Sequence, residues 1–526
     1  MCSFLIKMNK SLLQRLLDFY HIDYEKYLLL TRDVSLLTFK GNHEFDSIKE
    51  AVELVKEVIT DKGKIVIYGD YDADGVMGTS ILVKMFEYLD VVVDYYLPNR
   101  YLDGYGLNMA HVEEYVKAGY NLVITVDNGI TAFEPIEYLR NNGVKVLILD
   151  HHQAQENLPA ANAICHPIVS HFGETSSSGA FTAFIYSISL LGRIDKYLAL
   201  LASISVISDM MPLLEYNRDL LRSMFKEYKV GEFMAIDLLA DHEPINETII
   251  GMKIAPRINS IGRLIEDDSI NDIVKFFVSD NKEFILNYYS YILEMNEKRK
   301  EYSKIDINSL GINESEAAII ISGDFKEGVI GLIANSVMIK YEKPAIIFTR
   351  SVEGNLKGSA RAPEGYDIVS AFGELSEYLL TSGGHASAAG CSIKESDFEV
   401  FKNRFIEIIS NKPLIKVEHP SIEIGMSELS FENYELINSF SPFGESWPIP
   451  LFRLRRLKLD NLMYSKDHKH IITTIGNKMK LVFFNYPSEF VKTHSYGDVI
   501  GTLAKKNYRG VDYLEFNCKE FLESNI

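Results

Sequence analysis

The sequence predicts an α/β protein with a Rossmann-like parallel-sheet domain, a helical connector, a second α/β domain and a C-terminal β-barrel. Three observations support this fold class. Short β-branched runs alternate with helical stretches from Lys64 to Asp150, which is typical of a parallel sheet covered on both faces. A second strand and helix pattern begins near residue 317, and short strands with turn signals follow after about residue 416.

The elements of the first domain are read directly from the chain. Its strands are KIVIYGD, VVVDYYLP, NLVITVD and VKVLILD, and helices such as GVMGTSILVKMFEYL lie between them. Helical patterns then dominate up to the long amphipathic stretch NKEFILNYYSYILEMNEKRKEYSK, which we interpret as a connector. We expect five parts: an N-terminal helical segment over 1–45, the first α/β domain over 46–215, the connector over 216–310, the second α/β domain over 311–412 and an OB-fold barrel over 413–526.

Composition narrows the class of protein. The chain has 526 residues, 47% of them hydrophobic and 24% charged, as in folded multidomain proteins. Its four cysteines lack paired spacing, so neither a disulfide framework nor a thiolate zinc site is indicated. The N-terminus has no cleavage signature and no run is long enough to span a membrane, so we expect a cytoplasmic protein. A net charge of −19 opposes binding of a polyanion unless cations intervene.

Acidic side chains follow three of the predicted strands. Asp70, Asp72 and Asp74 come after IVIY, Asp127 comes after LVITV, and Asp150 comes after VKVLIL. Because parallel strands end at one edge of their sheet, all of these carboxylates should meet in one crevice. His151 and His152 follow Asp150 directly and add imidazole ligands.

Such a cluster raises its own pKa values and destabilises the fold unless cations neutralise it. Oxygen ligands with one or two imidazoles favour Mn²⁺ or Mg²⁺, and a pair of ions about 3.5 to 4 Å apart is the usual arrangement for displacement at phosphorus. The alternative is that each aspartate caps the following helix, which suits Asp74. Capping explains three strand ends together less well than metal binding does.

The order of the motifs YGDYDADG, TVDNG, LDHH and ISDMMP resembles the DHH phosphoesterase superfamily. Later segments, APRINSIGRL, EGVIGLIANSV, GSARA, SGGHASAAG and PFGESWPIPLF, resemble its RecJ branch of single-strand exonucleases. The resemblance implies a two-ion shell of Asp70, Asp72, Asp74, Asp127, His151 and Asp209. It also implies that Asp150 and His152 orient this shell or touch phosphate. Which of the first three aspartates binds which ion stays open.

The second α/β domain resembles the DHHA1 domain, which holds nucleic acid in this family. In SGGHASAAG, small residues allow backbone amides to approach phosphate, and His385 offers a charge-assisted donor. The alternative is a tight turn followed by a close-packed helix. Ser359 and Arg361 share one face of GSARA if it is extended, and by resemblance they grip a 5′-terminal phosphate together with Arg100. For Arg100 the alternative is a surface salt bridge with Asp103.

Further basic residues extend this expected nucleic-acid surface. Arg257, Asn259 and Arg263 alone are typical of a loop with solvated charges, but by resemblance they guide the strand. In the barrel, basic residues are interleaved with aromatic ones as in a single-strand binding platform, although a solvated strand face is an equal alternative. These barrel residues are Arg453, Arg455, Arg456, Lys458, Lys505, Lys506 and Arg509, with Phe452 and Tyr508.

Two departures from the family pattern are visible. Ala362 stands where many relatives have serine, and SSSGAF over 176–181 is a loose version of a Ser-Gly-Ala segment. By resemblance, the extra C-terminal region of some relatives is expected to be absent. Neither departure removes an expected metal ligand.

The resemblance implies a metal-dependent 5′-to-3′ exonuclease that degrades single-stranded DNA to 5′-mononucleotides in repair and recombination. Asp127, Asp150, His151, His152 and His385 would be its catalytic residues. A DHH phosphodiesterase acting on short oligonucleotides or cyclic dinucleotides, and a non-catalytic DNA-binding factor, are the alternatives. Partners implied are single-stranded DNA, a single-strand DNA-binding protein and a RecQ-type helicase, with no membrane and a monomeric state.

Overall fold

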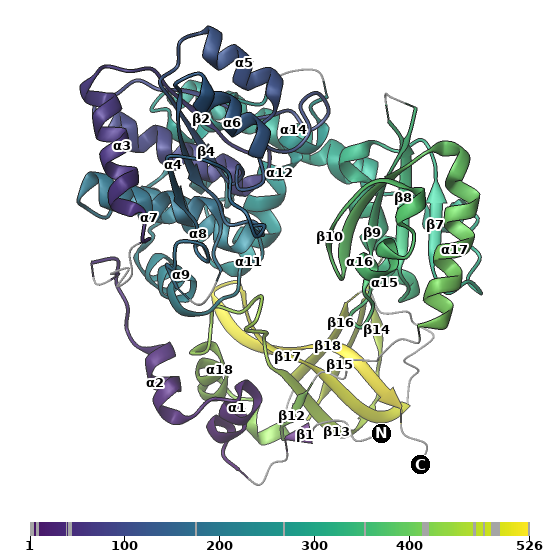
Figure 1. Cartoon of the computed structure of the whole chain (residues 1–526). Helices are drawn as coiled ribbons and strands as arrows, with labels where there is room; N and C mark the ends of the chain where they lie inside the picture. Colours follow the sequence, from purple (N-terminus) through teal and green to yellow (C-terminus); the bar gives the residue numbers. More distant parts are fainter. Residues whose placement is uncertain are drawn as a thin grey trace. The chain divides into compact units, whose positions relative to one another are not determined.

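The computed structural model describes residues 5–6, 10–37, 39, 45–173, 176–266, 269–351, 354–412, 420–466, 470–476, 479–484 and 495–523. The chain forms two compact units (Figure 1). Unit 1 contains residues 1–35, 212–222 and 418–526, and unit 2 contains residues 36–211 and 223–417. Cys2 and the expected boundary at residue 413 lie outside the described residues. Within the described part of the chain, no helix has the length and apolar character needed to cross a membrane.

Unit 2 begins with the predicted parallel sheet. Its five strands have the order β3-β2-β4-β5-β6, and every neighbouring pair is parallel. The strands are β2 (Ile65–Tyr68), β3 (Asp94–Tyr96), β4 (Leu122–Val126), β5 (Lys145–Leu149) and β6 (Ala163–Cys165). The central strands β2 and β4 are buried at every residue, which explains their continuous apolar runs.

Helices cover both faces of this sheet, as Figure 1 shows. One face packs on α5 and α6 in a cluster that includes Val112, Ile136 and Leu139. The long helix α4 is buried at 13 of its positions because further helices pack against it. The helices are α3 (Ile48–Thr60), α4 (Ala73–Glu87), α5 (Met109–Lys117), α6 (Phe133–Asn141), α7 (Gly179–Leu191) and α8 (Lys196–Ser208).

A helical segment leads to the second sheet and ends in the expected long helix, α14 (Lys282–Ser303). The expectation of a loop for APRINSIGRL is wrong, because these residues form helix α12 (Ala255–Leu264), which directly continues a π-helical turn. Pro256 lies where the π-helical turn passes into α12, a place where a proline commonly interrupts the regular hydrogen-bond pattern of a helix. The other elements are α9 (Glu215–Glu227), α10 (Met234–Leu239), α11 (Glu247–Ile249), η1 (Ile250–Ile254), α13 (Asp272–Val278) and η2 (Ile307–Leu310).

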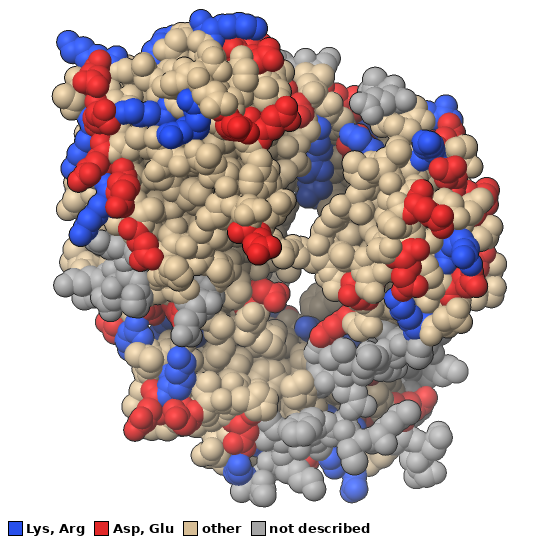
Figure 2. Space-filling model, in the orientation of Figure 1, with Lys and Arg blue, Asp and Glu red and all other residues tan. Residues whose placement is uncertain are grey.

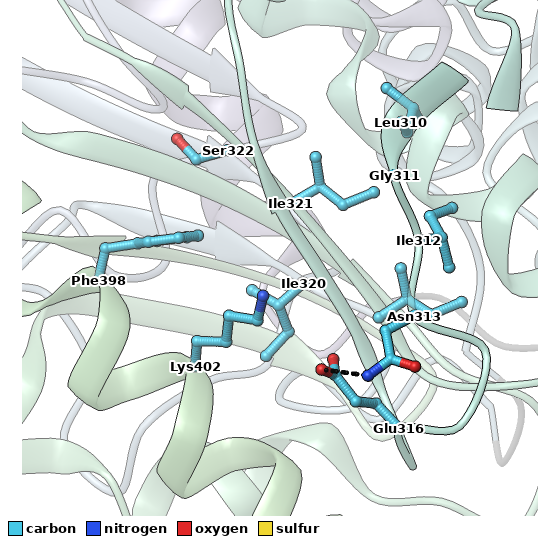
Figure 3. Close-up of a pocket in the computed structure, with 11 residues that line it drawn as sticks. Leu310, Gly311, Ile312, Asn313, Glu316, Ile320, Ile321, Ser322, Phe398 and Lys402 are labelled. Atoms are coloured by element: carbon cyan, nitrogen blue, oxygen red, sulfur yellow. Dashed lines mark hydrogen bonds between the residues drawn. The ribbon is translucent and has the colours of Figure 1, made fainter. Parts of the chain in front are cut away.

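The second sheet of unit 2 has the strand order β10-β11-β9-β8-β7 and is mixed, with only β7 and β8 parallel. Its strands are β7 (Ile319–Ser322), β8 (Ala345–Arg350), β9 (Leu356–Arg361), β10 (Leu379–His385) and β11 (Ala388–Ile393). Its helices are η3 (Glu327–Val329), α15 (Ile330–Tyr341), α16 (Ile368–Gly373), η4 (Ser376–Tyr378), η5 (Glu395–Asp397) and α17 (Phe398–Asn411). A pocket of about 240 Å³ lies beside β7, where Asn313 donates a hydrogen bond to Glu316 and Phe398 and Lys402 form another wall (Figure 3).

Unit 1 is built on a sheet of eight described strands in the order β1-β12-β13-β17-β18-β16-β15-β14. The N-terminal segment joins this C-terminal sheet, because β1 pairs with β12 and the buried Arg15 donates hydrogen bonds to Glu423 O and Glu428. The strands are β1 (Leu5–Ile6), β12 (Ser421–Glu423), β13 (Leu451–Leu459), β14 (Met463–Tyr464), β15 (His470–Ile475), β16 (Met479–Phe484), β17 (Ser495–Tyr508) and β18 (Val511–Glu523). The helices are α1 (Leu12–Tyr20), α2 (Tyr24–Thr31), η6 (Met426–Glu428) and α18 (Phe431–Asn438).

Charged side chains are mixed over the face drawn in Figure 2, where acidic and basic residues alternate within each unit. Basic side chains are also visible deep in the recess between the two α/β halves of unit 2. The net charge of −19 is therefore not one continuous acidic surface on this face.

Candidate metal centre and anion pocket

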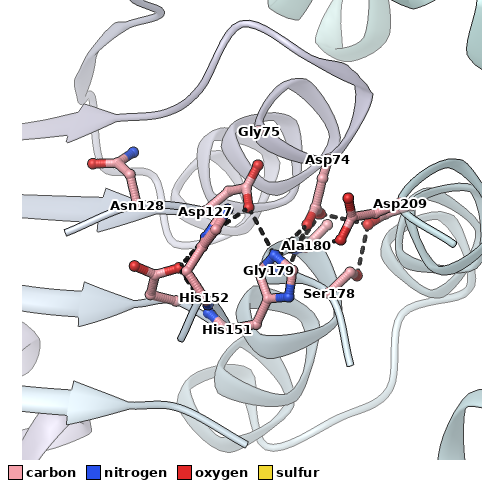
Figure 4. A network of polar contacts seen from close by, with 12 residues as sticks. Asp74, Gly75, Asp127, Asn128, His151, His152, Ser178, Gly179, Ala180 and Asp209 are labelled. Carbon is pink, nitrogen blue, oxygen red and sulfur yellow. Dashed lines mark hydrogen bonds and ion pairs between the residues drawn. The ribbon is translucent and has the colours of Figure 1, made fainter. Parts of the chain in front are cut away.

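The strand-end acids converge at the carboxyl edge of the first sheet. Asp70 and Asp72 follow β2, Asp127 follows β4, Asp150 follows β5, and Asp209 follows the end of α8. Figure 4 shows Asp74, Asp127, His151 and Asp209 pointing toward one another from different elements. In three groups the ligand atoms lie within 4.8 Å of one another: Asp127 with His151 and His152, Asp74 with His151 and Asp209, and Asp70 with Asp72 and Asp127.

The residue that caps α4 is Asp72, so the helix-cap interpretation of Asp74 is wrong. Asp72 Oδ1 accepts hydrogen bonds from the backbone N–H groups of Asp74 and Gly75 at 2.9 and 3.3 Å. Asp74 lies in the first turn, where its carboxylate is favoured by the helix dipole. It accepts hydrogen bonds from Gly179 N and Ala180 N, each at 2.7 Å, and from the Ser205 hydroxyl. Helices α7 and α8 thus fix Asp74 from the other side.

Asp127 is held in an uncommon backbone conformation, with a φ of 63°. Left-handed residues other than glycine store strain and gather at functional sites. Gly179 permits this arrangement, since a Cβ there would lie 2.7 Å from both Cα and Cβ of Asp127. The glycine of the loose SSSGAF segment is therefore required by the close approach of α7 to Asp127.

His151 lies at the centre of the cluster. Its Nε2 is 3.1 Å from Asp127 Oδ1 and 3.5 Å from both Asp74 Oδ2 and Asp209 Oδ2. Its side chain is 8% exposed, and burial lowers the pKa of the imidazole. A neutral imidazole between carboxylates is the form that binds a metal ion.

Asp150 acts on this cluster through its neighbours. Its two oxygens accept hydrogen bonds from the backbone N–H groups of Ile130 and His151 at 2.9 and 2.7 Å, and Oδ1 lies 2.8 Å from His152 Nδ1. Burial alone would raise the pKa of Asp150, but these hydrogen bonds and the His152 charge hold it well below its usual range. The same contact outweighs burial at His152 and raises its pKa to about 9. Asp150 therefore orients His152, as a carboxylate orients a ligating histidine.

The metal-free cluster is electrostatically unfavourable. Burial, and then the Asp72 carboxylate, raise the pKa of Asp70, whose Oδ1 is buried without a hydrogen-bond partner among the described residues. Burial and the Asp74 charge raise the pKa of Asp127, and they raise that of Asp209 to about 8. Burial and mutual repulsion outweigh the charges of His152 and Arg100 at these carboxylates, so the cluster needs further neutralisation, and its oxygen and imidazole donors fit Mn²⁺ or Mg²⁺.

A second group of residues in unit 2 forms a cluster of positive charge, which we call the cationic pocket because we expect it to hold an anion. Burial followed by the Arg100 charge lowers the pKa of Arg263 to about 10, and the charges of Arg299 and Arg361 act in the same direction while that of Asp72 opposes them. Arg361 Nη1 donates a hydrogen bond to Ser359 Oγ at 3.2 Å, which places both residues on one face of β9 as expected. Several guanidinium groups at close range repel one another unless an anion lies between them.

Arg100 belongs to this pocket and not to a surface salt bridge with Asp103. Its guanidinium stacks on the Tyr71 ring at 4.4 Å, and its buried Nε has no hydrogen-bond partner in the described part of the chain. Asp103 instead accepts hydrogen bonds from Asn99 N and Tyr96 Oη and pairs with His111.

All three expected strand-guiding residues have partners within the protein, and for Arg263 the partner is Gly328 O, which accepts from Nη1 at 3.1 Å. Asn259 Oδ1 accepts a hydrogen bond from Ala73 N at 2.8 Å, so it supports the aspartate loop. Arg257 binds Asp241 through both terminal nitrogens at 2.8 and 3.0 Å, which lowers the pKa of Asp241 to about 2. Their contact with a nucleic-acid strand stays a prediction.

The SGGHASAAG segment forms a β-hairpin. His385 ends β10 and pairs with Ala388 of β11, so the alternative of a turn followed by a helix is wrong. The residues of β10 after Leu379 are exposed, and His385 is not part of the three candidate metal-binding groups. Its contact with phosphate stays a prediction.

In unit 1, Phe452 is only 1% exposed and packs in the core, so the expectation that it stacks on bases is wrong. Tyr508 is 62% exposed, and Arg509 lies over its ring at 5.2 Å. Several of the basic residues form ion pairs, such as Arg453 with Asp498 and Lys505 with Asp512. A single-strand platform on this unit stays a prediction.

Sequence reasoning missed several residues of both sites. They are Tyr71 and Arg299 beside the cationic pocket, Ser205 on Asp74, and Tyr105, whose hydroxyl lies 3.0 Å from His152 Nε2. Tyr71 stands within the motif YGDYDADG, and Tyr105 stands in the segment PNRYLDGYG that contains Arg100, so their positions were the available signal. Arg299 and Ser205 lie on helices distant in sequence from these motifs, and no sequence pattern pointed to them.

Comparison with known proteins places the chain in a class. Family models match at residues 64–204 (DHH family, N-terminal domain), 315–411 (DHHA1 domain) and 421–520 (RecJ OB domain). The parallel sheet and its acidic edge lie within the first of these matches, so this part of the chain is similar to the DHH family. The other two matches follow it in the order DHHA1 domain and RecJ OB domain along the chain. The expected OB-type domain is thereby confirmed, while the five domain ranges stay predictions.

The relatives agree with this assignment. The single-stranded-DNA-specific exonuclease RecJ of Bacillus subtilis is 30% identical over 86% of this chain, which spans 59% of that relative's length. The protein of the same name from Haemophilus influenzae is 28% identical, with coverage of 95% of this chain and 93% of the relative. A crystal structure of RecJ in complex with Mn²⁺ from Thermus thermophilus shares the fold with a TM-score of 0.83 at 23% identity, covering 100% of this chain and 81% of that one.

Proposed function

We propose that this protein is a metal-dependent exonuclease that degrades single-stranded DNA from the 5′ end to 5′-mononucleotides, in repair and recombination. The observation that carries the proposal is the cluster of the buried Asp70 and Asp127 with the partly exposed His151 and Asp209, whose raised carboxyl pKa values call for divalent cations. The two relatives described above are both named single-stranded-DNA-specific exonucleases, which supports the same substrate.

The proposed ligands come from two of the three groups of donors. Asp74, His151 and Asp209 would hold one ion, and Asp70, Asp72 and Asp127 would hold the other. Two such ions supply charge neutralisation at the scissile phosphate and activation of water. Asp150 orients His152 through the 2.8 Å contact, which keeps a proton-carrying imidazole at the edge of the cluster.

The cationic pocket supports the polarity of cutting. Arg100, Ser359 and Arg361 would bind the 5′-terminal phosphate, because arginine presents paired N–H donors to phosphate oxygens. A pocket that accepts only a terminal phosphate, at a fixed reach from the metal ions, makes the enzyme cut from that end. His385 would add a donor, and Arg257, Asn259 and Arg263 would guide the following strand.

Partners beyond the DNA substrate form a finer part of the proposal. A single-strand DNA-binding protein and a RecQ-type helicase would supply single strands, and the enzyme would act as a monomer. A cytoplasmic location is supported by Cys165, Cys391 and Cys518, which are free thiols in the described part of the chain.

The test is a time course with Mn²⁺ on 5′-labelled single-stranded DNA, matched duplex, short RNA and a cyclic dinucleotide in parallel. Asp127→Ala should abolish cleavage while leaving DNA binding measurable. Asp94→Ala is the matched control, because Asp94 is exposed and bonded to Tyr120 away from the cluster. Turnover of the cyclic dinucleotide or short RNA alone would favour the phosphodiesterase alternative. Cleavage retained by Asp127→Ala would contradict the metal role.

A further inference from the structure

Three elements of unit 2 meet at the hydroxyl of Tyr101. The hydroxyl donates a hydrogen bond to Arg263 O, at the end of α12, with an oxygen–oxygen distance of 2.5 Å. It accepts one from Gly328 N of η3 at 3.1 Å. Arg263 Nη1 closes the arrangement by donating to Gly328 O at 3.1 Å. We call these three residues the Tyr101 junction.

The junction leaves no space at Gly328. A Cβ on this residue would lie 1.9 Å from Arg263 O and 2.7 Å from Tyr101 Oη. The first of these atoms is backbone, so any side chain at Gly328 would push η3 away from α12. The close approach of the second α/β domain to α12 therefore depends on a glycine at this position.

Each residue of the Tyr101 junction either is part of the cationic pocket or lies close in the chain to a residue that forms or borders it. Tyr101 follows Arg100 directly in the loop after β3, and Arg263 contributes its own guanidinium. Gly328 leads into α15, where a Cβ on Gly331 would lie 3.0 Å from Ser359 Oγ and 3.1 Å from Arg361 Nη2. A shift at Gly328 would thus be passed through the first turn of α15 to the Ser359 and Arg361 side of the pocket.

We infer that Tyr101 is a positioning residue that sets the spacing between the Arg100 and Arg361 sides of the anion pocket. This inference rests on the proposed function, since it assigns to that pocket the recognition of a terminal phosphate. Phenylalanine fills the same volume but can neither donate to Arg263 O nor accept from Gly328 N. Burial raises the pKa of Tyr101, so its hydroxyl keeps the proton that it donates.

The experiment compares the wild-type protein with Tyr101→Phe on one single-stranded sequence that carries either a 5′-phosphate or a 5′-hydroxyl. The ratio of kcat/KM for the two ends measures phosphate recognition. Loss of the bridging hydroxyl should lower this ratio about fivefold, mainly through KM on the phosphorylated end. Mn²⁺ affinity and cleavage of the 5′-hydroxyl strand should stay at their wild-type values, because Tyr101 contacts no candidate metal ligand in the described structure.

Tyr197→Phe is the matched control, because Tyr197 donates to Phe277 O at 2.6 Å away from the pocket. It should leave the ratio unchanged, and Gly328→Ala should lower it as Tyr101→Phe does. If the wild-type protein is active and prefers the phosphorylated end, an unchanged kcat/KM ratio in Tyr101→Phe overturns the inference about Tyr101 and leaves the proposed function standing. If the wild-type protein cleaves neither strand, both the proposed function and the inference are wrong. An equal fall in Tyr197→Phe also overturns the inference, since it would show a general loss of stability.

Discussion

Manganese affinity should rise steeply with pH, because the buried carboxyl groups must lose protons before an ion can bind. Burial and the Asp74 charge raise the pKa of Asp209 to about 8, and the pKa values of Asp70 and Asp127 are also raised. Without metal, the folded protein therefore holds protons that the unfolded chain releases near pH 4. The stability that these protons confer is present below that pH and is lost as pH rises toward about 8. Metal binding replaces them.

The magnitude follows from Asp209 alone. A group with a pKa of about 8 is ionised to about 1% at pH 6, about 10% at pH 7 and about 50% at pH 8. If one proton leaves for each ion bound, the apparent Kd should fall about tenfold from pH 6 to pH 7 and about fivefold more by pH 8. Protons on Asp70 and Asp127 would make the dependence steeper.

Titration calorimetry across this pH range, in two buffers with different ionisation enthalpies, measures both the Kd and the protons released. Asp209→Asn should flatten the dependence, because it removes the titrating group. Asp94→Asn, at an exposed position bonded to Tyr120, should retain the wild-type profile. A Kd that does not change between about pH 6 and pH 8 would refute this account of the cluster.

Three further substitutions test individual contacts. Gly179→Ala should lower the free energy of unfolding by about 1 to 3 kcal/mol and weaken Mn²⁺ binding, because the added Cβ would lie 2.7 Å from Asp127 Cβ. Thermal unfolding with and without Mn²⁺ measures both effects. An unchanged Mn²⁺ affinity would contradict this prediction. Tyr105→Phe removes the hydroxyl that contacts His152 and should lower kcat about tenfold, as measured by steady-state cleavage. A wild-type kcat would show that Tyr105 does not hold His152 in place. Arg361→Ala should weaken the preference for a phosphorylated 5′ end in paired substrate assays, and an unaltered preference would remove it from the pocket.

The sequence alone predicted the convergence of the acids correctly. Asp70, Asp127 and Asp150 each follow a β-branched run, and parallel strands must end at one edge, so chain order was enough to bring them together. The resemblance added Asp209, which no local pattern of strands would have assigned to this edge. The resemblance also grouped Arg100, Ser359 and Arg361, and in the structure the charges of both arginines act on Arg263 while Arg361 donates to Ser359.

Other features needed the packed structure. The choice of Asp72 over Asp74 as the cap of α4 depends on Gly179, Ala180 and Ser205, which approach from helices distant in sequence. Ala255–Leu264 has the composition of a solvated loop, but packing in the connector makes it a helix. Phe452 alternates with basic residues along β13, and only the folded sheet shows that the strand face carrying Phe452 is buried.

The sequence by itself determined the class of fold, the edge at which the acids gather and the kind of ion they fit, because strand periodicity and ligand chemistry are local properties. Tertiary structure alone decided which oxygens remain available to an ion, how Gly179 and Gly328 permit close approach, and how Tyr101 joins the two sides of the anion pocket. Those outcomes depend on contacts between segments that lie far apart in the sequence, by more than two hundred residues for Tyr101 and Gly328. No local pattern encodes such contacts.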